Sequence, residues 1–223
     1  LFGFNLKQNF AFPYFSRDIA EFWRRWHISL STWFRDYLYI PLGGSRGGTW
    51  MKVRNTFIIF IVSGFWHGGN WTFVAWGALN AVYFLPLLLL NKNRRNTDVV
   101  AQGKYIPTIK ELFNIGITFF LTALAWVFFR AENIGHAWRY ISEIFSSSLF
   151  KSPYYLGIGL TVSTILLIIV FVLVEWIGRE DKYAIEKLGL IWRRPLRLVF
   201  YYFIIFVVYY FGGEEQEFIY FQF

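Results

Sequence analysis

The sequence contains no cysteine, which excludes disulfides, thiolate nucleophiles and cysteine-based metal sites. Charge is also scarce, because only 16% of the 223 residues are Asp, Glu, Lys or Arg. Hydrophobic residues make up 56% of the chain and aromatic residues 23%. A soluble domain of this length carries more charge and fewer aromatic side chains. These proportions predict an integral membrane protein. The three scattered histidines form no metal-ligand pattern, so we expect no bound metal.

The apolar residues gather in five segments that approach or exceed the length needed to cross a bilayer. These segments are residues 53–66, 71–90, 109–129, 155–178 and 196–212. We therefore predict an all-α fold, a polytopic transmembrane bundle of about five spans. We expect residues 1–223 to form a single membrane domain, with its transmembrane helices between residues 53 and 212. The first segment is short, so it either crosses at a tilt or enters and returns on one side.

The basic residues are distributed unevenly between the loops. Nineteen of the 22 Lys and Arg residues fall in alternate loops, namely residues 7–54, 92–110 and 179–197. This is the positive-inside pattern, which places those loops in the cytoplasm and the acidic tail outside. Topology therefore explains the net charge of +8, and we expect the lipid bilayer, not nucleic acid, as the partner.

Residues 16–44 combine aromatic and basic side chains. Between Phe15 and Leu38 the apolar residues recur at helical spacing, which predicts one amphipathic helix with its tryptophans at headgroup depth. Asp18 and Glu21 resemble a capping box at its start, and Pro41 ends it. The region thus forms an interfacial or re-entrant motif.

Two roles for this motif remain open. It is either an interfacial anchor with a solvated basic face, or the inner-side lining for an anionic donor whose phosphates arginines grip. In the second case His27 is a polar contact in a channel. The candidate donor-binding residues are then Arg24, Ser31, Arg35, Arg46 and Lys52.

His67 ends the nearly uncharged run TFIIFIVSGFWHGGNW, residues 56–71. An ionisable side chain there is costly, which makes it a candidate functional residue. Ser63, one helical turn earlier, and Asn70 are candidate tunnel-lining residues. His67 either hydrogen-bonds across a helix interface or acts as a general base, since apolar surroundings keep imidazole neutral. No Asp or Glu lies nearby in sequence, which favours direct transfer over a Ser-His-Asp acyl-enzyme.

Two stretches carry a family likeness. EFWRRWHISLSTWFRDYLYIPLGG (residues 21–44), followed by GFWHG (residues 64–68), resembles the membrane-bound O-acyltransferase family, most closely its bacterial polysaccharide branch, which includes alginate O-acetylation. The ending FGGEEQEFIYFQF also resembles that branch. The likeness covers nearly the whole chain and implies the carboxy-terminal half of a larger protein. It also implies a many-helix bundle around a membrane tunnel, with His67 as the catalytic residue and His27 as the second characteristic polar position.

The resemblance implies a membrane O-acetyltransferase in the bacterial inner membrane. The acetyl group would move from acetyl-CoA or another acyl thioester, a substrate and not a bound cofactor, toward hydroxyls of an exported polysaccharide. Periplasmic or extracellular acetyltransferase proteins are the implied partners. The alternatives are a transporter without chemistry, or a scaffold that docks such enzymes through its acidic, aromatic tail, residues 214–223.

Overall fold

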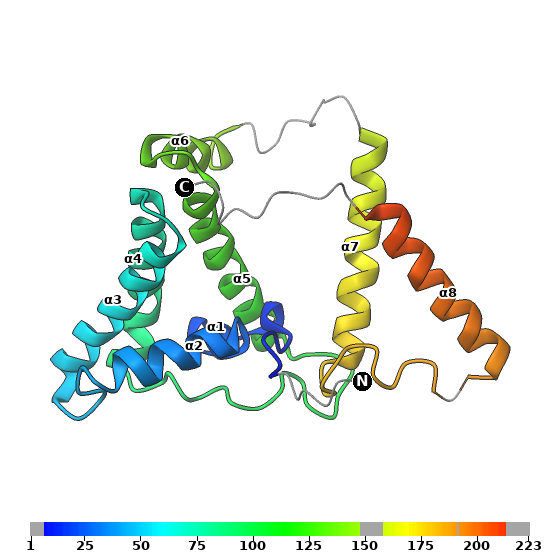
Figure 1. Ribbon diagram of the computed structural model, residues 1–223, viewed down its shortest axis with the longest axis horizontal. Helices are drawn as coiled ribbons and strands as arrows, with labels where there is room; N and C mark the ends of the chain where they lie inside the picture. The colour runs from blue at the N-terminus through cyan, green and yellow to red at the C-terminus, as the bar shows by residue number, and fades with distance from the viewer. Residues whose placement is uncertain (1–6, 148–157, 191, 213–223) are drawn as a thin grey trace. The chain divides into compact units, whose positions relative to one another are not determined.

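The computed structural model describes residues 7–147, 158–190 and 192–212, and every regular element in these ranges is helical (Figure 1). The chain divides into two compact units, Leu1–Leu173 and Val174–Phe223. The tail proposed as a docking strip lies outside the described residues. The elements are η1 (Pro13–Phe15), α1 (Ile19–Arg25), α2 (Ile28–Phe34), η2 (Arg35–Tyr39, a π-helix), α3 (Gly48–His67), α4 (Trp71–Leu89), α5 (Ile109–Arg130), α6 (Ile134–Ile144), α7 (Ile158–Gly178) and α8 (Arg194–Phe211).

The first unit is built on a hairpin of α3 and α4. Two glycines set how closely these helices approach, as in many membrane helix pairs. A Cβ atom added to Gly64 would lie 2.2 Å from the Phe73 carbonyl oxygen, and one added to Gly77 would lie 2.2 Å from the Phe60 carbonyl oxygen. The two backbones therefore touch at both positions, which fixes the distance between the helices.

Helix α5 packs against α4, and the short helix α6 packs against both (Figure 1). A capping box starts α5, because Thr108 and Glu111 each satisfy a backbone N–H of the other. At the far end Asn133 accepts a hydrogen bond from the backbone N–H of His136 and starts α6. Helices α1 and α6 lie near opposite ends of α5 (Figure 1).

The predicted single amphipathic helix across residues 15–38 is wrong. The chain forms α1, breaks at Trp26 and His27, and continues as α2 and η2. Trp26 is extended, and His27 adopts the left-handed conformation with φ 46° and ψ 57°. Asp18 caps α1 as predicted, but the Glu21 carboxylate accepts from the backbone N–H of Arg17, so the capping box is incomplete. Pro41 follows the last helical turn, as predicted.

All five predicted apolar segments contain a helix where the structure describes them, which confirms the all-α membrane class. Three of these helices, α4, α5 and α8, are long and apolar enough to cross a membrane. Within α7, Val162–Gly178 is a shorter apolar stretch. Helix α3 has 20 residues, and Lys52 and Arg54 near its start reduce its hydropathy. At about 1.5 Å per residue α3 is about 30 Å long, similar to the hydrocarbon core.

The second unit contains the end of α7, the turn that follows, and α8. Gly178 makes the turn possible, because an added Cβ atom would lie 2.1 Å from the Ala184 carbonyl oxygen. The buried guanidinium of Arg179 lies 4.2 Å from the centre of the Trp176 ring and donates to the Trp176 carbonyl oxygen. Helix α8 carries exposed apolar side chains along its length, as expected of a lipid-facing or partner-covered helix.

Candidate active site

His27 lies at a backbone turn that neighbouring segments hold in place. A left-handed conformation at a residue other than glycine costs about 1 kcal/mol, so other contacts must compensate. The backbone N–H of Ala11 donates to the Arg25 carbonyl oxygen at 3.0 Å, and that of Ile28 donates to the Asn9 carbonyl oxygen at 2.9 Å. The Asn9 side-chain oxygen also accepts from the backbone N–H of Ser29 at 3.0 Å. Asn9 therefore caps α2 from outside the helix.

Because Asn9 caps α2, the imidazole of His27 is not needed for capping. His27 occupies the N-cap position of α2, yet its side chain makes no capping hydrogen bond. Its Nδ1 atom is buried without a hydrogen-bond partner in the protein, and so is Nε1 of Trp23. Because buried polar atoms are nearly always paired, two unpaired ones on one surface indicate a place for a polar ligand or water.

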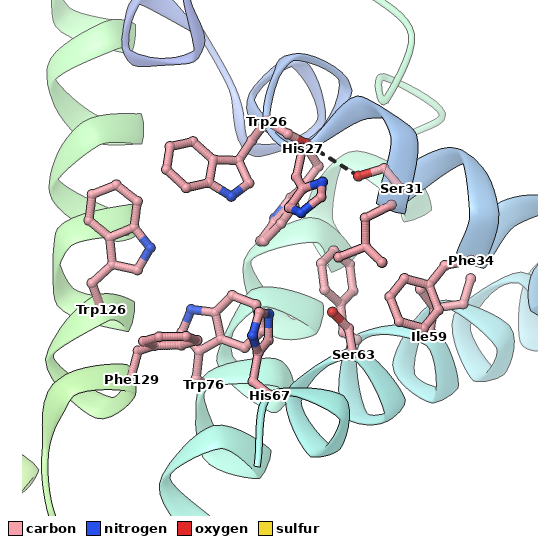
Figure 2. Close-up of a pocket in the computed structure, with 13 residues that line it drawn as sticks. Trp26, His27, Ser31, Phe34, Ile59, Ser63, His67, Trp76, Trp126 and Phe129 are labelled. Carbon is pink, nitrogen blue, oxygen red and sulfur yellow. Dashed lines mark hydrogen bonds between the residues drawn. The ribbon is translucent and has the colours of Figure 1, made fainter. Parts of the chain in front are cut away.

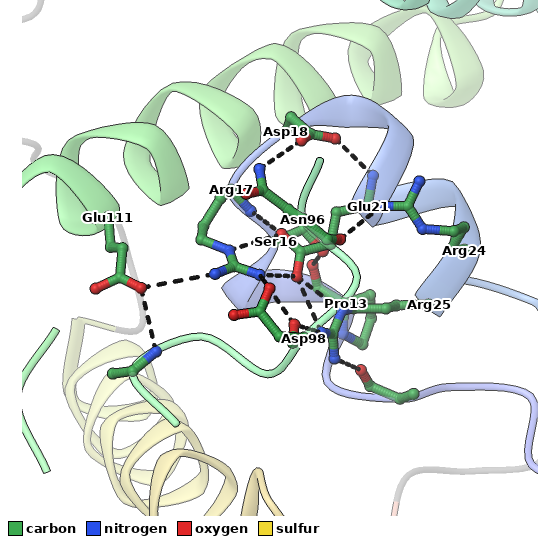
Figure 3. Close-up of polar contacts among 12 residues, drawn as sticks. Pro13, Ser16, Arg17, Asp18, Glu21, Arg24, Arg25, Asn96, Asp98 and Glu111 are labelled. Carbon is green, nitrogen blue, oxygen red and sulfur yellow. Dashed lines mark hydrogen bonds and ion pairs between the residues drawn. The ribbon is translucent and has the colours of Figure 1, made fainter. Parts of the chain in front are cut away.

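Helix α1 is anchored by a buried carboxylate (Figure 3). The Glu21 side chain is 1% exposed and forms ion pairs with Arg17 at 3.1 Å and Arg25 at 2.9 Å. Arg17 also donates to Asp98 at 2.9 Å, which ties α1 to the loop before α5. Burial alone would lower the pKa of Arg17, but its hydrogen bonds to Glu21 and Asp98 raise it above the ordinary value. The hydrogen bond from Arg17 holds the pKa of Asp98 below its usual range.

His67 is the last residue of α3 and packs among aromatic rings. Its ring centre lies 5.0 Å from those of Trp66 and Phe129, 5.4 Å from Trp76 and 6.4 Å from Phe73. The next residue must be small, because a Cβ atom on Gly68 would lie 2.6 Å from the Phe73 ring. The side chain is half-buried.

The two histidines line the same cavity, of about 280 Å³ (Figure 2). His27 enters from the α1–α2 turn and His67 from the end of α3, with Trp126 and Phe129 of α5 alongside. Among the residues that line this histidine cavity, the ionisable side chains are the two imidazoles. Helices α1 to α5 thus bring together two residues that are forty positions apart. The sequence motifs identified both histidines as candidates, but the separation of the two motifs along the chain did not predict that the histidines share a cavity.

A second cavity of about 230 Å³ shares Ser31, Ile59 and Phe60 with the histidine cavity. We call it the basic cavity, because Arg35 and Arg94 line it. Its other lining residues include Tyr39, Ser45, Thr56 and Asn93.

Only two of the five predicted donor-binding residues line these two cavities. Ser31 lines both cavities, and Arg35 lines the basic cavity, where it also pairs with Asp36 at 2.7 Å. The Arg24 guanidinium donates to the carbonyl oxygens of Asn93 and Asn96, both at 2.6 Å. Arg46 lies exposed in the turn before α3, and Lys52 lies half-buried in the first turns of α3. Neither of these two lines the described cavities.

Sequence reasoning missed Arg94, although the positive-inside pattern had placed its loop on the same side as residues 16–44. Of the tunnel-lining candidates, Ser63 lines the histidine cavity. Asn70 lies elsewhere, where its side chain caps α4 and donates to the Glu132 carbonyl oxygen at 2.9 Å. Within the described residues, no group of three or more His, Asp or Glu side chains is placed to hold a metal ion.

The fold and site define a helical membrane protein with two imidazoles facing one largely aromatic cavity. The sequence profile of MBOAT, the membrane-bound O-acyltransferase family, matches residues 1–128. The chain belongs to this family.

Its relatives include the probable alginate O-acetylase AlgI of Pseudomonas putida, which is 34% identical over 249 residues, covering 100% of this chain and 47% of the relative. The probable alginate O-acetylase AlgI of Azotobacter vinelandii is 44% identical over 146 residues, 66% of this chain and 27% of the relative. The peptidoglycan O-acetyltransferase of Helicobacter pylori is 42% identical over 136 residues, 61% of this chain and 24% of the relative. The chain therefore spans less than half the length of each of these three.

Proposed function

We propose that the full-length protein is a membrane O-acetyltransferase that transfers acetyl groups from a thioester donor to hydroxyls of an exported polysaccharide. Family membership supports the acyl-transfer class, and the relatives named for alginate and peptidoglycan acetylation support a glycan as the final acceptor. The observation that carries the proposal is that His27 and His67 line one cavity. Acetyl-CoA or another acetyl thioester is the proposed donor, in the bacterial inner membrane.

The basic cavity supports donor entry from the cytoplasmic side. Its two arginines suit the phosphates of an anionic donor. Because it shares Ser31, Ile59 and Phe60 with the histidine cavity, a pantetheine-like arm can extend from one to the other. The donor-binding residues proposed here are Arg35, Arg94 and Ser31, with Arg24, Arg46 and Lys52 contributing positive charge nearby.

In the proposed reaction, neutral His67 accepts the proton of the acceptor hydroxyl as its oxygen attacks the thioester carbonyl carbon. The carbon–sulfur bond then breaks, and the proton passes from the imidazolium to the departing sulfur, giving a thiol and an acetate ester. The unpaired Trp23 Nε1–H and the His27 imidazole are available to hydrogen-bond the oxyanion. Periplasmic or extracellular partner proteins relay the acetyl group where the acceptor is not the polysaccharide itself.

The experiment compares His67→Gln with wild type in the full-length protein, at equal abundance in the membrane. Labelled acetyl thioester is supplied, and both thioester consumption and acetyl ester formation are measured. Removing a general base typically lowers the rate about 10²- to 10⁴-fold. Phe65→Ala is the matched control, because it is 67% exposed on the same helix. Normal transfer by His67→Gln would exclude His67 as the base.

The same assay separates the two alternatives. A transporter leaves the thioester intact in the wild-type protein. A scaffold tolerates loss of both histidines but loses activity of the assembled complex when residues 214–223 are removed.

A further inference from the structure

The loop between α4 and α5, residues 90–108, contains no helix and brings Asn93 and Arg94 into the lining of the basic cavity. It is longer than the roughly 12–15 residues beyond which a loop without regular structure is uncommon and usually functional. Arg94 is exposed, so the position of its guanidinium depends on what holds the surrounding backbone.

Arg24 holds that backbone on both sides of Arg94. The Arg24 guanidinium donates one hydrogen bond from Nη1 to the Asn93 carbonyl oxygen and another from Nη2 to the Asn96 carbonyl oxygen, each at 2.6 Å. A guanidinium presents its N–H donors in a rigid, planar fork, so it can fix two carbonyl groups relative to each other, whereas an ammonium is a compact point charge. We call residues 93–98 the clamped loop.

Further hydrogen bonds from α1 and the residues before it hold the second half of the clamped loop (Figure 3). Asn96 donates to the Asp18 carboxylate at 2.6 Å, and Arg25 donates to the Asp98 carbonyl oxygen at 2.8 Å. Arg17 donates to both the carbonyl oxygen and the carboxylate of Asp98, each at 2.9 Å. The clamped loop is therefore held against a single helix.

The same helix leads to the turn at His27. Helix α1 ends at Arg25, and His27 follows two residues later, at the start of α2. Helix α1 thus connects the wall of the basic cavity that carries Arg94 with the wall of the histidine cavity that carries His27. A shift of the clamped loop along α1 would change the distance between a phosphate bound at Arg94 and the two imidazoles.

Sequence analysis places Arg24 among the residues that bind the donor phosphates. In the structure Arg24 lines neither the basic cavity nor the histidine cavity, and both of its terminal nitrogens donate to loop carbonyl oxygens. Direct contact with a phosphate would require Arg24 to release these carbonyls. The geometry therefore favours an indirect role.

We propose that Arg24 is a positioning residue for the donor site. By hydrogen-bonding the carbonyl oxygens of Asn93 and Asn96, it fixes Arg94 in the basic cavity and so aligns the donor with the histidine cavity. Arg94 contacts the donor phosphates, and Arg24 acts through Arg94. This inference rests on the proposed acetyl transfer.

The test uses Arg24→Lys in the full-length protein in detergent, with acetyl-CoA as the donor and coenzyme A as the binding probe. Lysine keeps the positive charge but lacks the fork that holds both carbonyls. The donor KM and the Kd for coenzyme A should rise about five- to tenfold, because two charge-assisted hydrogen bonds to the loop are lost or weakened. The kcat at saturating donor and the acceptor KM should stay near their wild-type values. Hydrogen exchange at the backbone amides of the clamped loop should become faster.

Arg95→Gln is the matched control. Arg95 is exposed in the clamped loop and lines neither the basic cavity nor the histidine cavity, so its loss removes one positive charge without disturbing the contacts of Arg24. This variant should bind coenzyme A as the wild type does. The inference is wrong if Arg24→Lys also keeps the wild-type Kd and donor KM, or if Arg95→Gln weakens binding as much as Arg24→Lys does.

Arg94→Gln and its combination with Arg24→Lys show whether Arg24 acts through Arg94. Residues that act as a unit are non-additive, so the double variant should bind coenzyme A about as weakly as Arg94→Gln alone. If the two losses multiply, Arg24 contributes to donor binding independently of Arg94, and the inference is overturned.

Failure of the proposed function has a different signature: the wild type binds coenzyme A but leaves acetyl-CoA intact. The Kd values of the same variants then still support or overturn the role of Arg24. If the wild type does not bind coenzyme A, the basic cavity is not the site of such a donor, and the positioning role is wrong.

Discussion

The turn at His27 is held by buried ion pairs and backbone hydrogen bonds, whereas the helix end at His67 is held by aromatic rings and close-packed glycines. The first arrangement keeps His27 in a strained left-handed conformation. The ion pairs of Glu21 with Arg17 and Arg25 hold the preceding helix, α1, in place. The second places an imidazole by packing, through the close approach of α3 and α4 at Gly64 and Gly77. The comparison suggests that polar contacts fix the backbone conformation at one histidine, while packing fixes the helix separation at the other.

The largest effect is expected at Glu21. Replacing it with Ala leaves Arg17 and Arg25 buried without their carboxylate, which should cost about 3–5 kcal/mol of stability. Unfolding in detergent, followed by denaturant titration, measures this loss. Asp36→Asn is the control, because it removes only the solvent-exposed pair with Arg35, which water screens, and it should leave stability nearly unchanged. Equal effects of the two variants would show that the buried ion pairs do not hold the turn.

The next largest effect is expected in the hairpin. Gly64→Ala forces a Cβ atom into the Phe73 carbonyl, so α3 and α4 must separate, at a cost of about 1–3 kcal/mol. Gly116→Ala on α5 has open space around the new Cβ and should be neutral or stabilise the helix by up to about 1 kcal/mol. Thermal unfolding of the pair measures the difference. A neutral Gly64→Ala variant would contradict the close approach of the two backbones.

A smaller effect is expected at the external cap of α2. Asn9→Ala removes the acceptor for the Ser29 N–H and should cost about 1 kcal/mol. Because this cap adjoins His27, acetyl transfer should fall more than stability alone explains. Asn9→Asp keeps the acceptor oxygen and should restore both properties. If Asn9→Asp is as impaired as Asn9→Ala, the side-chain cap is not what holds the turn.

The smallest expected effect is on the pH dependence of stability, and it involves Asp98. Hydrogen bonding by Arg17 lowers the pKa of Asp98 in the folded protein, so ionised Asp98 stabilises the fold above its unfolded pKa of about 4. This contribution is lost as the pH falls through the lower, folded pKa. Asp98→Asn should therefore flatten the decline in stability below about pH 4. Denaturant titrations between neutral and acidic pH test this, and parallel pH curves for the two proteins would contradict it.

The sequence predicted the apolar helices well, because runs of membrane length leave few alternatives for the backbone. It failed at His27, where apolar spacing continues across a break that is maintained by contacts from residues distant in sequence, among them Asn9 and Ala11. The pairing of Arg17 with Asp98 joins residues 81 positions apart and left no local pattern. The motifs identified His27 and His67, but their common cavity depends on α5 supplying Trp126 and Phe129. Arg94 could have been predicted by assuming that the basic loops at residues 7–54 and 92–110, which the positive-inside pattern places on the same side of the membrane, contribute to one binding site.

The central claim, that His27 and His67 serve one reaction in one cavity, is tested most directly by a double-mutant comparison. Acetyl-transfer rates are measured for His27→Ala, His67→Ala and the double variant, at equal membrane abundance. Residues that act as a unit are strongly non-additive, so the double variant should lose about as much as the more damaging single variant. If the two losses multiply, the histidines act independently, and a single two-histidine site is contradicted.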